Sequence, residues 1–136
     1  MAKEETFMNL MTDFAFKRIF GTKERKHLLI RFLNLIFEDE NLVVHDVVYH
    51  DKEVLPEDAD GKRIIYDIYC TVNNDEKHII LEMQQIYRPL FENRAVYYIS
   101  KAITEQGKKG WDFALSPVYA VFLVDFHFPH ILKSAA

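Results

Sequence analysis

The chain has 136 residues, a formal net charge of −4 and a hydrophobic content of 49%. We therefore expect one domain over residues 1–136, because this length supports a single core and the apolar content excludes a disordered chain. No apolar run reaches the length of a membrane span, and the polar start at residues 1–5 lacks a secretory signal, so we expect a cytoplasmic protein without membrane contact.

The N-terminal part of the sequence predicts two helices. Thr12 or Asp13 can cap a short helix that runs to Phe20, and Gly21 is placed to end it. A longer helix follows over residues 23–37, where leucine, isoleucine and phenylalanine recur at helical spacing between charged residues.

The middle of the chain predicts three strands. A valine-rich strand covers residues 42–50, and a polar loop follows over residues 52–61. Residues 63–72 and 77–84 are rich in β-forming residues and are separated by the turn-forming residues 73–76, which indicates a hairpin.

The expected register of this hairpin brings two carboxylates together. If the turn is centred between residues 74 and 75, Asp67 faces Glu82 across the two strands. Directly opposed side chains have Cβ atoms roughly 4.5 to 5.5 Å apart, so like charges there destabilise the sheet unless a cation compensates them. Two alternatives stay open at this point: a bulge that shifts Asp67 off Glu82, or a solvated acidic residue that pairs with Arg63 or a lysine.

The two faces of the hairpin differ in character. Asp67, Glu82 and Gln84 share one face, because side chains two residues apart in a strand point the same way. Three oxygen donors of this kind suit Mg²⁺ or Mn²⁺. The opposite face is apolar and predicts a core position for Ile64, Tyr66, Ile68, Cys70, Val72, Ile79, Leu81 and Met83.

One helix and one strand complete the predicted fold. Pro89 can begin a helix that runs to about Gln106, where Gly107 can end it. Residues 117–126 are too continuously apolar for a half-exposed strand, so we expect a strand buried on both faces in the centre of the sheet. The order helix, helix, three strands, helix, strand predicts an α/β fold with a mixed sheet flanked by helices, in which the last helix crosses over to a parallel strand.

This order, with an aspartate in the second strand and a Glu-x-Gln in the third, resembles the restriction-endonuclease-like core of the PD-(D/E)XK nuclease superfamily. Within it, the chain is similar to the recombination-promoting nuclease and putative transposase family, in the segments Thr12–Gly21, Asp67-Ile68, Ile80–Gln84 and Arg94 with Tyr97-Tyr98. The resemblance covers roughly residues 8–125. Members of this family often continue past the nuclease core, so the chain could be the N-terminal part of a longer protein.

The resemblance implies an endonuclease that hydrolyses phosphodiester bonds of DNA with Mg²⁺ or Mn²⁺, in a recombination or mobile-element system. It implies that Asp67 and Glu82 are metal ligands, and that Gln84 occupies the position held by lysine in most of the superfamily. The positive charge that this lysine would supply must then come from elsewhere. Lys17 of the opening motif is the first candidate, and Arg94 is the second.

Further site residues follow from the same resemblance and from helical spacing. Asp13 matches an acidic residue of the opening motif and is either a further metal ligand or a plain helix cap. Arg94, Tyr97 and Lys101 lie at positions i, i+3 and i+7 of the predicted helix, where they could bind DNA phosphates. A partly buried tyrosine between two solvated charges is the alternative interpretation of that stripe.

The alternative to a nuclease is a catalytically inactive DNA-binding or protein-interaction module on the same fold. The net charge of −4 argues against broad nonspecific attraction to DNA, although acidic metal ligands contribute to this charge. Opposed carboxylates favour the enzyme, because a module without catalysis has no physical reason to keep them. The sequence leaves a homodimer open.

Overall fold

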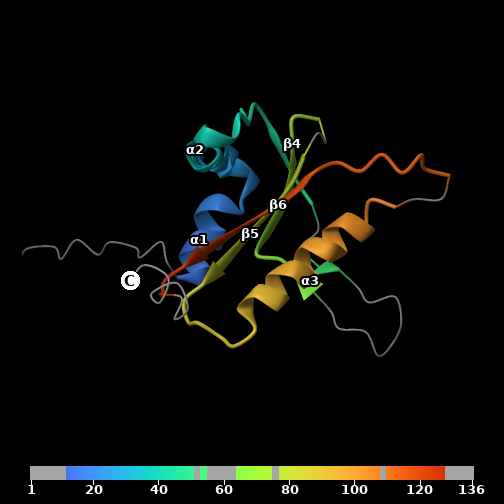
Figure 1. Ribbon diagram of the computed structural model, residues 1–136. Helices are drawn as coiled ribbons and strands as arrows, with labels where there is room; N and C mark the ends of the chain where they lie inside the picture. Colours follow the sequence, from blue (N-terminus) through green and yellow to red (C-terminus); the bar gives the residue numbers. More distant parts are fainter. Residues whose placement is uncertain (1–11, 51–52, 55–63, 75–76, 108–109, 128–136) are drawn as a thin grey trace, which may run out of the picture.

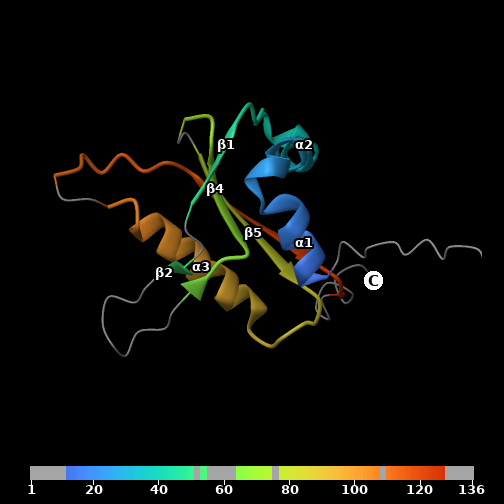
Figure 2. The same cartoon turned by 180° about the vertical axis from the view of Figure 1, so that it is seen from behind.

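A computed structural model describes residues 12–50, 53–54, 64–74, 77–107 and 110–127. Its middle layer is a four-stranded mixed sheet in the order β1 (Val47–Tyr49), β4 (Ile68–Val72), β5 (Lys77–Gln84) and β6 (Val118–Val124). Helices α1 (Asp13–Phe20) and α2 (Lys26–Ile36) cover one face, and α3 (Phe91–Thr104) covers the other (Figure 1). The view from behind shows the same layers (Figure 2). The predicted α/β fold with a mixed sheet flanked by helices is thereby confirmed.

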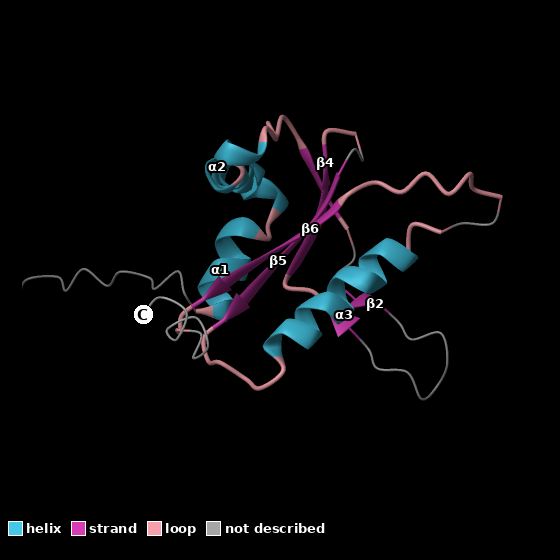
Figure 3. Cartoon of the chain, in the orientation of Figure 1, coloured by secondary structure: helices cyan, strands magenta, loops and turns pink. Residues whose placement is uncertain are grey.

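The remaining elements are short. Single 3₁₀ turns precede and follow α2, at Lys23–Arg25 and Glu38–Glu40. Strands β2 (Glu53–Val54) and β3 (Ile64–Ile65) pair antiparallel in a separate small sheet that the sequence did not predict (Figure 3). None of the helices in the described ranges is both long and apolar enough to cross a bilayer.

The hairpin has the predicted register. Strands β4 and β5 run antiparallel, with Val72 paired to Lys77 and Ile68 paired to Leu81. Asn73 and Asn74 begin the turn with positive φ angles of 54° and 60°, which asparagine tolerates better than most residues. Strand β6 lies parallel to β5, so the predicted crossover through the last helix is also correct.

Helix α1 begins and ends as the sequence predicted. The Thr12 side chain accepts a hydrogen bond from the Ala15 amide at 3.2 Å, so Thr12 is the cap and Asp13 is the first helical residue. At the other end, the Gly21 amide donates to the Lys17 carbonyl. A Cβ atom at Gly21 would lie 2.5 Å from that carbonyl oxygen, so only glycine fits where α1 ends.

The first strand is shorter than the predicted range of residues 42–50. Only Val47–Tyr49 pair with β4. Side chains satisfy the main chain just before this strand: Asn34 bonds both the amide and the carbonyl of Val44, and Asn73 accepts from the His45 amide. The apolar character of the segment is explained by burial, because Leu42 and Val44 lie in the core without belonging to the sheet.

The predicted strand over residues 63–72 is broken at Tyr66 and Asp67. Ile64–Ile65 pair with β2, whereas Ile68–Val72 belong to the main sheet. The break reverses the predicted orientation of Tyr66, which lies fully buried on the α3 side with Tyr69 and Ile80. Six residues of the predicted apolar face are confirmed as core beneath α1 and α2: Ile68, Cys70, Val72, Ile79, Leu81 and Met83. Ile64 belongs to β3 of the small sheet, and its side chain lies outside the described residues, so its predicted core position stays a prediction. Burial raises the pKa of the Cys70 thiol to about 12.

The prediction that the last strand is central in the sheet is wrong. Strand β6 has β5 as its neighbour and forms an edge of the described sheet. Its two faces nevertheless meet apolar layers, because Tyr119, Val121 and Leu123 pack on the α1 and α2 side while Val118 and Ala120 pack on the α3 side. The apolar sequence of β6 is therefore explained by the burial of both of its faces and not by a second neighbouring strand.

Candidate functional site

The strand break turns the opposed carboxylates into an interlocked pair. The Asp67 amide donates to Oε1 of Glu82 at 3.0 Å, and the Met83 amide donates to Oδ2 of Asp67 at 2.7 Å. Each carboxylate thus accepts a hydrogen bond from the main chain beside the other. This exchange replaces the regular ladder just before the first residue of β4 and holds both acids in place through the main chain.

Glu82 is the more buried member of the pair. It is 5% exposed, and its burial, followed by the negative charge of Asp67, raises the pKa of its carboxyl from 4.5 to about 8. The Asp67 amide and the positive charges of Arg94 and Lys17 oppose this rise in pKa. Burial and a neighbouring like charge therefore make the charged form of Glu82 costly, which is the condition that a bound cation relieves.

We expect this carboxyl to make the stability of the cation-free protein fall with rising pH. Between pH 4.5 and 8 the unfolded chain has released the Glu82 proton while the folded chain holds it, because the folded pKa is raised to about 8. Stability then falls across this window by at most about 1.4 kcal/mol per pH unit.

The prediction is tested by urea unfolding from pH 4.5 to 9 without divalent cations. Because other groups also titrate, the quantity to compare is the difference in unfolding free energy between the wild type and Glu82→Gln. The unfolding free energy of Glu82→Gln should increase relative to that of the wild type as the pH rises. A constant difference across the window would contradict the raised pKa.

Lys17 brings a positive charge to the acid pair from α1. Its Nζ lies 3.4 Å from Oδ1 of Asp67, and the two side chains are 37% and 14% exposed. Position 17 is in the last turn of α1, whose end is set by Gly21, so the close fit of that glycine helps to place the lysine. A partly exposed ion pair of this kind contributes little to stability, so its position matters more for the chemistry of the site.

The donor set fits a hydrated divalent cation. One oxygen of each carboxylate is used by a main-chain amide, which leaves Oδ1 of Asp67 and Oε2 of Glu82 as candidate ligand atoms. Gln84 follows on the same face of β5 and is half-buried. Mg²⁺ and Mn²⁺ commonly take one or two carboxylates and complete their shells with water. Among the described residues no group of three or more His, Cys, Asp or Glu side chains could hold a metal ion, so the site offers two carboxylates and not a closed cage.

Arg94 brings a second positive charge to the acid pair, from α3 on the face of the sheet opposite to α1. Its guanidinium donates to the Tyr98 hydroxyl at 2.9 Å and lies 5.3 Å from the centre of the Tyr98 ring. Tyr66 in turn donates to the main-chain carbonyl of Tyr98 at 3.0 Å. Tyr66, which the strand break places on the α3 side, therefore links α3 through this hydrogen bond to the chain segment next to the carboxylates.

The structure thus brings together Lys17, Asp67 and Glu82, with the charge of Arg94 acting on Glu82. Tyr97 and Lys101 lie farther along α3, where the Lys101 ammonium is 5.7 Å from the centre of the Tyr97 ring. Arg94 turns to Tyr98 and not to this pair, so the predicted stripe is divided into two separate contacts.

Two further outcomes concern the predicted site. The interpretation of Asp13 as a helix cap is wrong, because Thr12 is the cap. The side chain of Asp13 lies outside the described residues, so its role as a metal ligand stays a prediction. Sequence reasoning missed the contributions of Tyr66 and Tyr98. The spacing of four residues between Arg94 and Tyr98 could have indicated their contact on one helix face.

Comparison with known proteins identifies the family of this chain. A family model described as PD-(D/E)XK nuclease family transposase matches residues 10–135. The matched range includes both carboxylates, Lys17 and all of α3, and it confirms the resemblance seen in the sequence motifs. No significant match was found among curated proteins or among solved structures.

Proposed function

The chain belongs to the PD-(D/E)XK nuclease family transposases, and from this membership we propose that it is a DNA endonuclease that uses Mg²⁺ or Mn²⁺ in a recombination or mobile-element system. The observation that carries the proposal is the interlocked pair of Asp67 and Glu82. Two carboxylates are held together at a cost in charge repulsion, and a divalent cation removes that cost.

The acid pair would hold the cation through Oδ1 of Asp67 and Oε2 of Glu82. When bound, the cation would supply Lewis acidity toward the scissile phosphate and would lower the pKa of a water molecule. The main-chain amides of Asp67 and Met83 keep the two carboxylates oriented. Gln84 can add a neutral carbonyl oxygen on the same face of the strand.

Lys17 is the residue we assign to the charge that develops on the phosphate. Its ammonium already lies at the acid pair, 3.4 Å from Asp67, and it is exposed enough to reach a substrate. Gln84 carries no charge and cannot do this. Arg94 acts on Glu82 from the other side, and we assign it, together with Tyr97 and Lys101, to contacts with DNA phosphates.

We expect Asp67→Ala to lose most of the heat of Mg²⁺ or Mn²⁺ binding in calorimetric titrations. The substitution removes one of two charged ligands, whereas the main-chain amide of Asp67 that bonds Glu82 remains. Asp46→Ala is a matched control, because Asp46 forms an ion pair with Lys26 at 2.7 Å and is exposed. Cation binding that survives in Asp67→Ala would refute the assignment of this ligand.

A module that only binds DNA is the competing function. Such a module gains nothing from a glutamate that is 5% exposed beside an aspartate, because burial makes the charged form of Glu82 costly. The buried acid pair therefore supports the enzyme over the module.

A further inference from the structure

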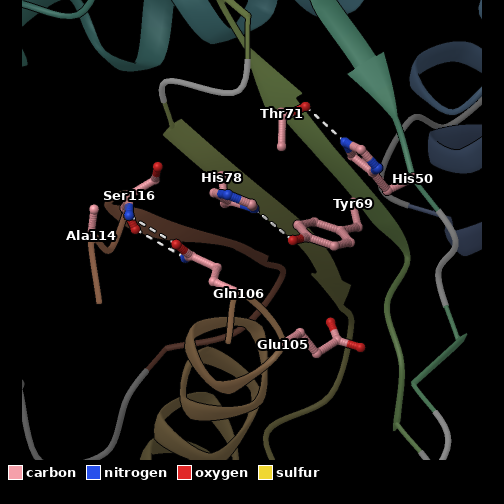
Figure 4. Close-up of a pocket in the computed structure, with 8 residues that line it drawn as sticks. All are labelled: His50, Tyr69, Thr71, His78, Glu105, Gln106, Ala114 and Ser116. Atoms are coloured by element: carbon pink, nitrogen blue, oxygen red, sulfur yellow. Dashed lines mark hydrogen bonds between the residues drawn. The ribbon is translucent and has the colours of Figure 1, made fainter. Parts of the chain in front are cut away.

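A cavity of about 440 Å³ lies on the α3 side of the sheet (Figure 4), and neither Asp67 nor Glu82 is among its lining residues. Its walls come from His50, Tyr69, Thr71 and His78 on the sheet side and from Glu105 and Gln106 at the end of α3. Its volume is within the range of small-molecule sites. Neither the family match nor the proposed chemistry uses this cavity.

Hydrogen bonds hold the aromatic rings of the cavity in place. The Tyr69 hydroxyl and Nδ1 of His78 are 2.6 Å apart, and the two rings are stacked with an interplanar angle of 28°. Nε2 of His50 lies 2.7 Å from the Thr71 hydroxyl. Tyr69 is itself buried in the core, so it backs the imidazole of His78 and fixes this half-buried flat ring at the cavity wall. Flat rings of this kind are the surfaces on which unpaired nucleobases stack.

The opposite wall carries a carboxylate. Burial raises the pKa of Glu105 above its usual range, and the nearby charge of Lys101 opposes this. Gln106 anchors the wall, because its side chain bonds both the amide and the carbonyl of Ser116, at 2.8 and 3.0 Å. A carboxylate repels phosphate but accepts N–H groups, so it favours the amino-bearing edge of a base over a nucleotide phosphate.

The cavity and the Glu82 side chain lie on the same face of β5. His78 and Glu82 are four residues apart on β5, with Ile80 between them on that face. This spacing corresponds to about 13 Å along a strand. A stacked nucleic-acid strand covers that length with about four nucleotides, and an extended strand with fewer.

We propose that this cavity binds one unstacked amino-bearing base (guanine, cytosine or adenine) of the DNA substrate, a few nucleotides from the phosphate that is cut. The base stacks on the ring of His78, which Tyr69 backs, and donates N–H groups to Glu105. The inference rests on the proposed function for the identity of the substrate. It makes the cavity a determinant of where the enzyme cuts.

The test measures base binding without any cation and without cleavage. Deoxyguanosine, deoxycytidine, deoxyadenosine, thymidine and inorganic phosphate are titrated into the whole chain while the imidazole NMR signals of His50 and His78 are followed. We expect shifts with one or more of the three amino-bearing nucleosides, at least about tenfold weaker binding of thymidine, and no shift with phosphate. Glu105→Gln should abolish the preference, whereas Glu38→Gln, an exposed glutamate next to α2, should leave it unchanged.

A second measurement covers the case of weak nucleoside binding. Affinities are compared for short single-stranded oligonucleotides, each with one abasic position. One position should lose about tenfold in affinity, as expected when a single stacked base is removed. An equal effect at every position, or shifts caused by phosphate, would overturn the proposal.

The two proposals fail in different ways. Base-dependent binding without cleavage of any DNA would leave the cavity assignment intact and refute the nuclease. Cleavage that does not depend on the base at any nearby position would refute the cavity assignment alone.

Discussion

DNA cleavage should be lost in Glu82→Ala. This substitution removes a carboxylate that we expect to bind the cation, and it also removes the acceptor for the Asp67 amide at 3.0 Å. The variant therefore also loses one of the two hydrogen bonds that fix the main chain at the strand break. We therefore expect no detectable nicking or linearisation of plasmid DNA at any concentration of Mg²⁺ or Mn²⁺.

Glu82→Gln separates the two effects of that substitution. Its amide oxygen can still accept from the Asp67 amide, so the variant should keep the local structure while it lacks the negative charge. Both variants should be inactive, and Glu38→Gln should cleave like the wild type. Cleavage by the wild type in EDTA, or by Glu82→Gln with Mg²⁺, would exclude the proposed role of this carboxylate.

The second large effect is expected at Lys17. Lys17→Ala should lower the rate of cleavage by about one hundredfold or more, the order expected when one electrostatic contact to a developing charge is removed. Cation affinity should not weaken, because the variant also removes the ammonium that competes for Asp67 at 3.4 Å. Single-turnover cleavage and calorimetric titration of the same sample measure the two quantities.

Lys26→Ala is the matched control, since Lys26 forms a comparable ion pair with Asp46 at 2.7 Å on another part of the surface. Its cleavage rate should be unchanged. Normal cleavage by Lys17→Ala together with a folded but inactive Arg94→Ala would show that Arg94 on α3 supplies the compensating positive charge. The assignment of Lys17 would then be wrong.

Local sequence signals predicted the parts of the fold that depend on neighbouring residues. Thr12 and Gly21 set the ends of α1 through contacts within four residues, and the turn after Val72 set the hairpin register. The opposition of Asp67 and Glu82 followed from that register alone. These are short-range effects, and a single sequence contains them.

The errors in the lengths of the first two strands occurred where a distant side chain replaces a backbone partner. Asn34 bonds Val44 and shortens the first strand, and Glu82 accepts the Asp67 amide and breaks the second. The partners are separated by 10 and 15 residues, so no local pattern reveals them. The proximity of Lys17 to Asp67 was likewise implied only by family resemblance, because it depends on how α1 packs against the sheet.

The interlocked carboxylates also determine at which stage the side chains of the site lose conformational entropy. Because a main-chain amide fixes each carboxylate, the two side chains are ordered during folding and not during ligand binding. An arriving cation then replaces water and, below about pH 8, the proton of Glu82, but it needs little rearrangement of the protein. The same two hydrogen bonds that interrupt the sheet leave behind a preorganised site.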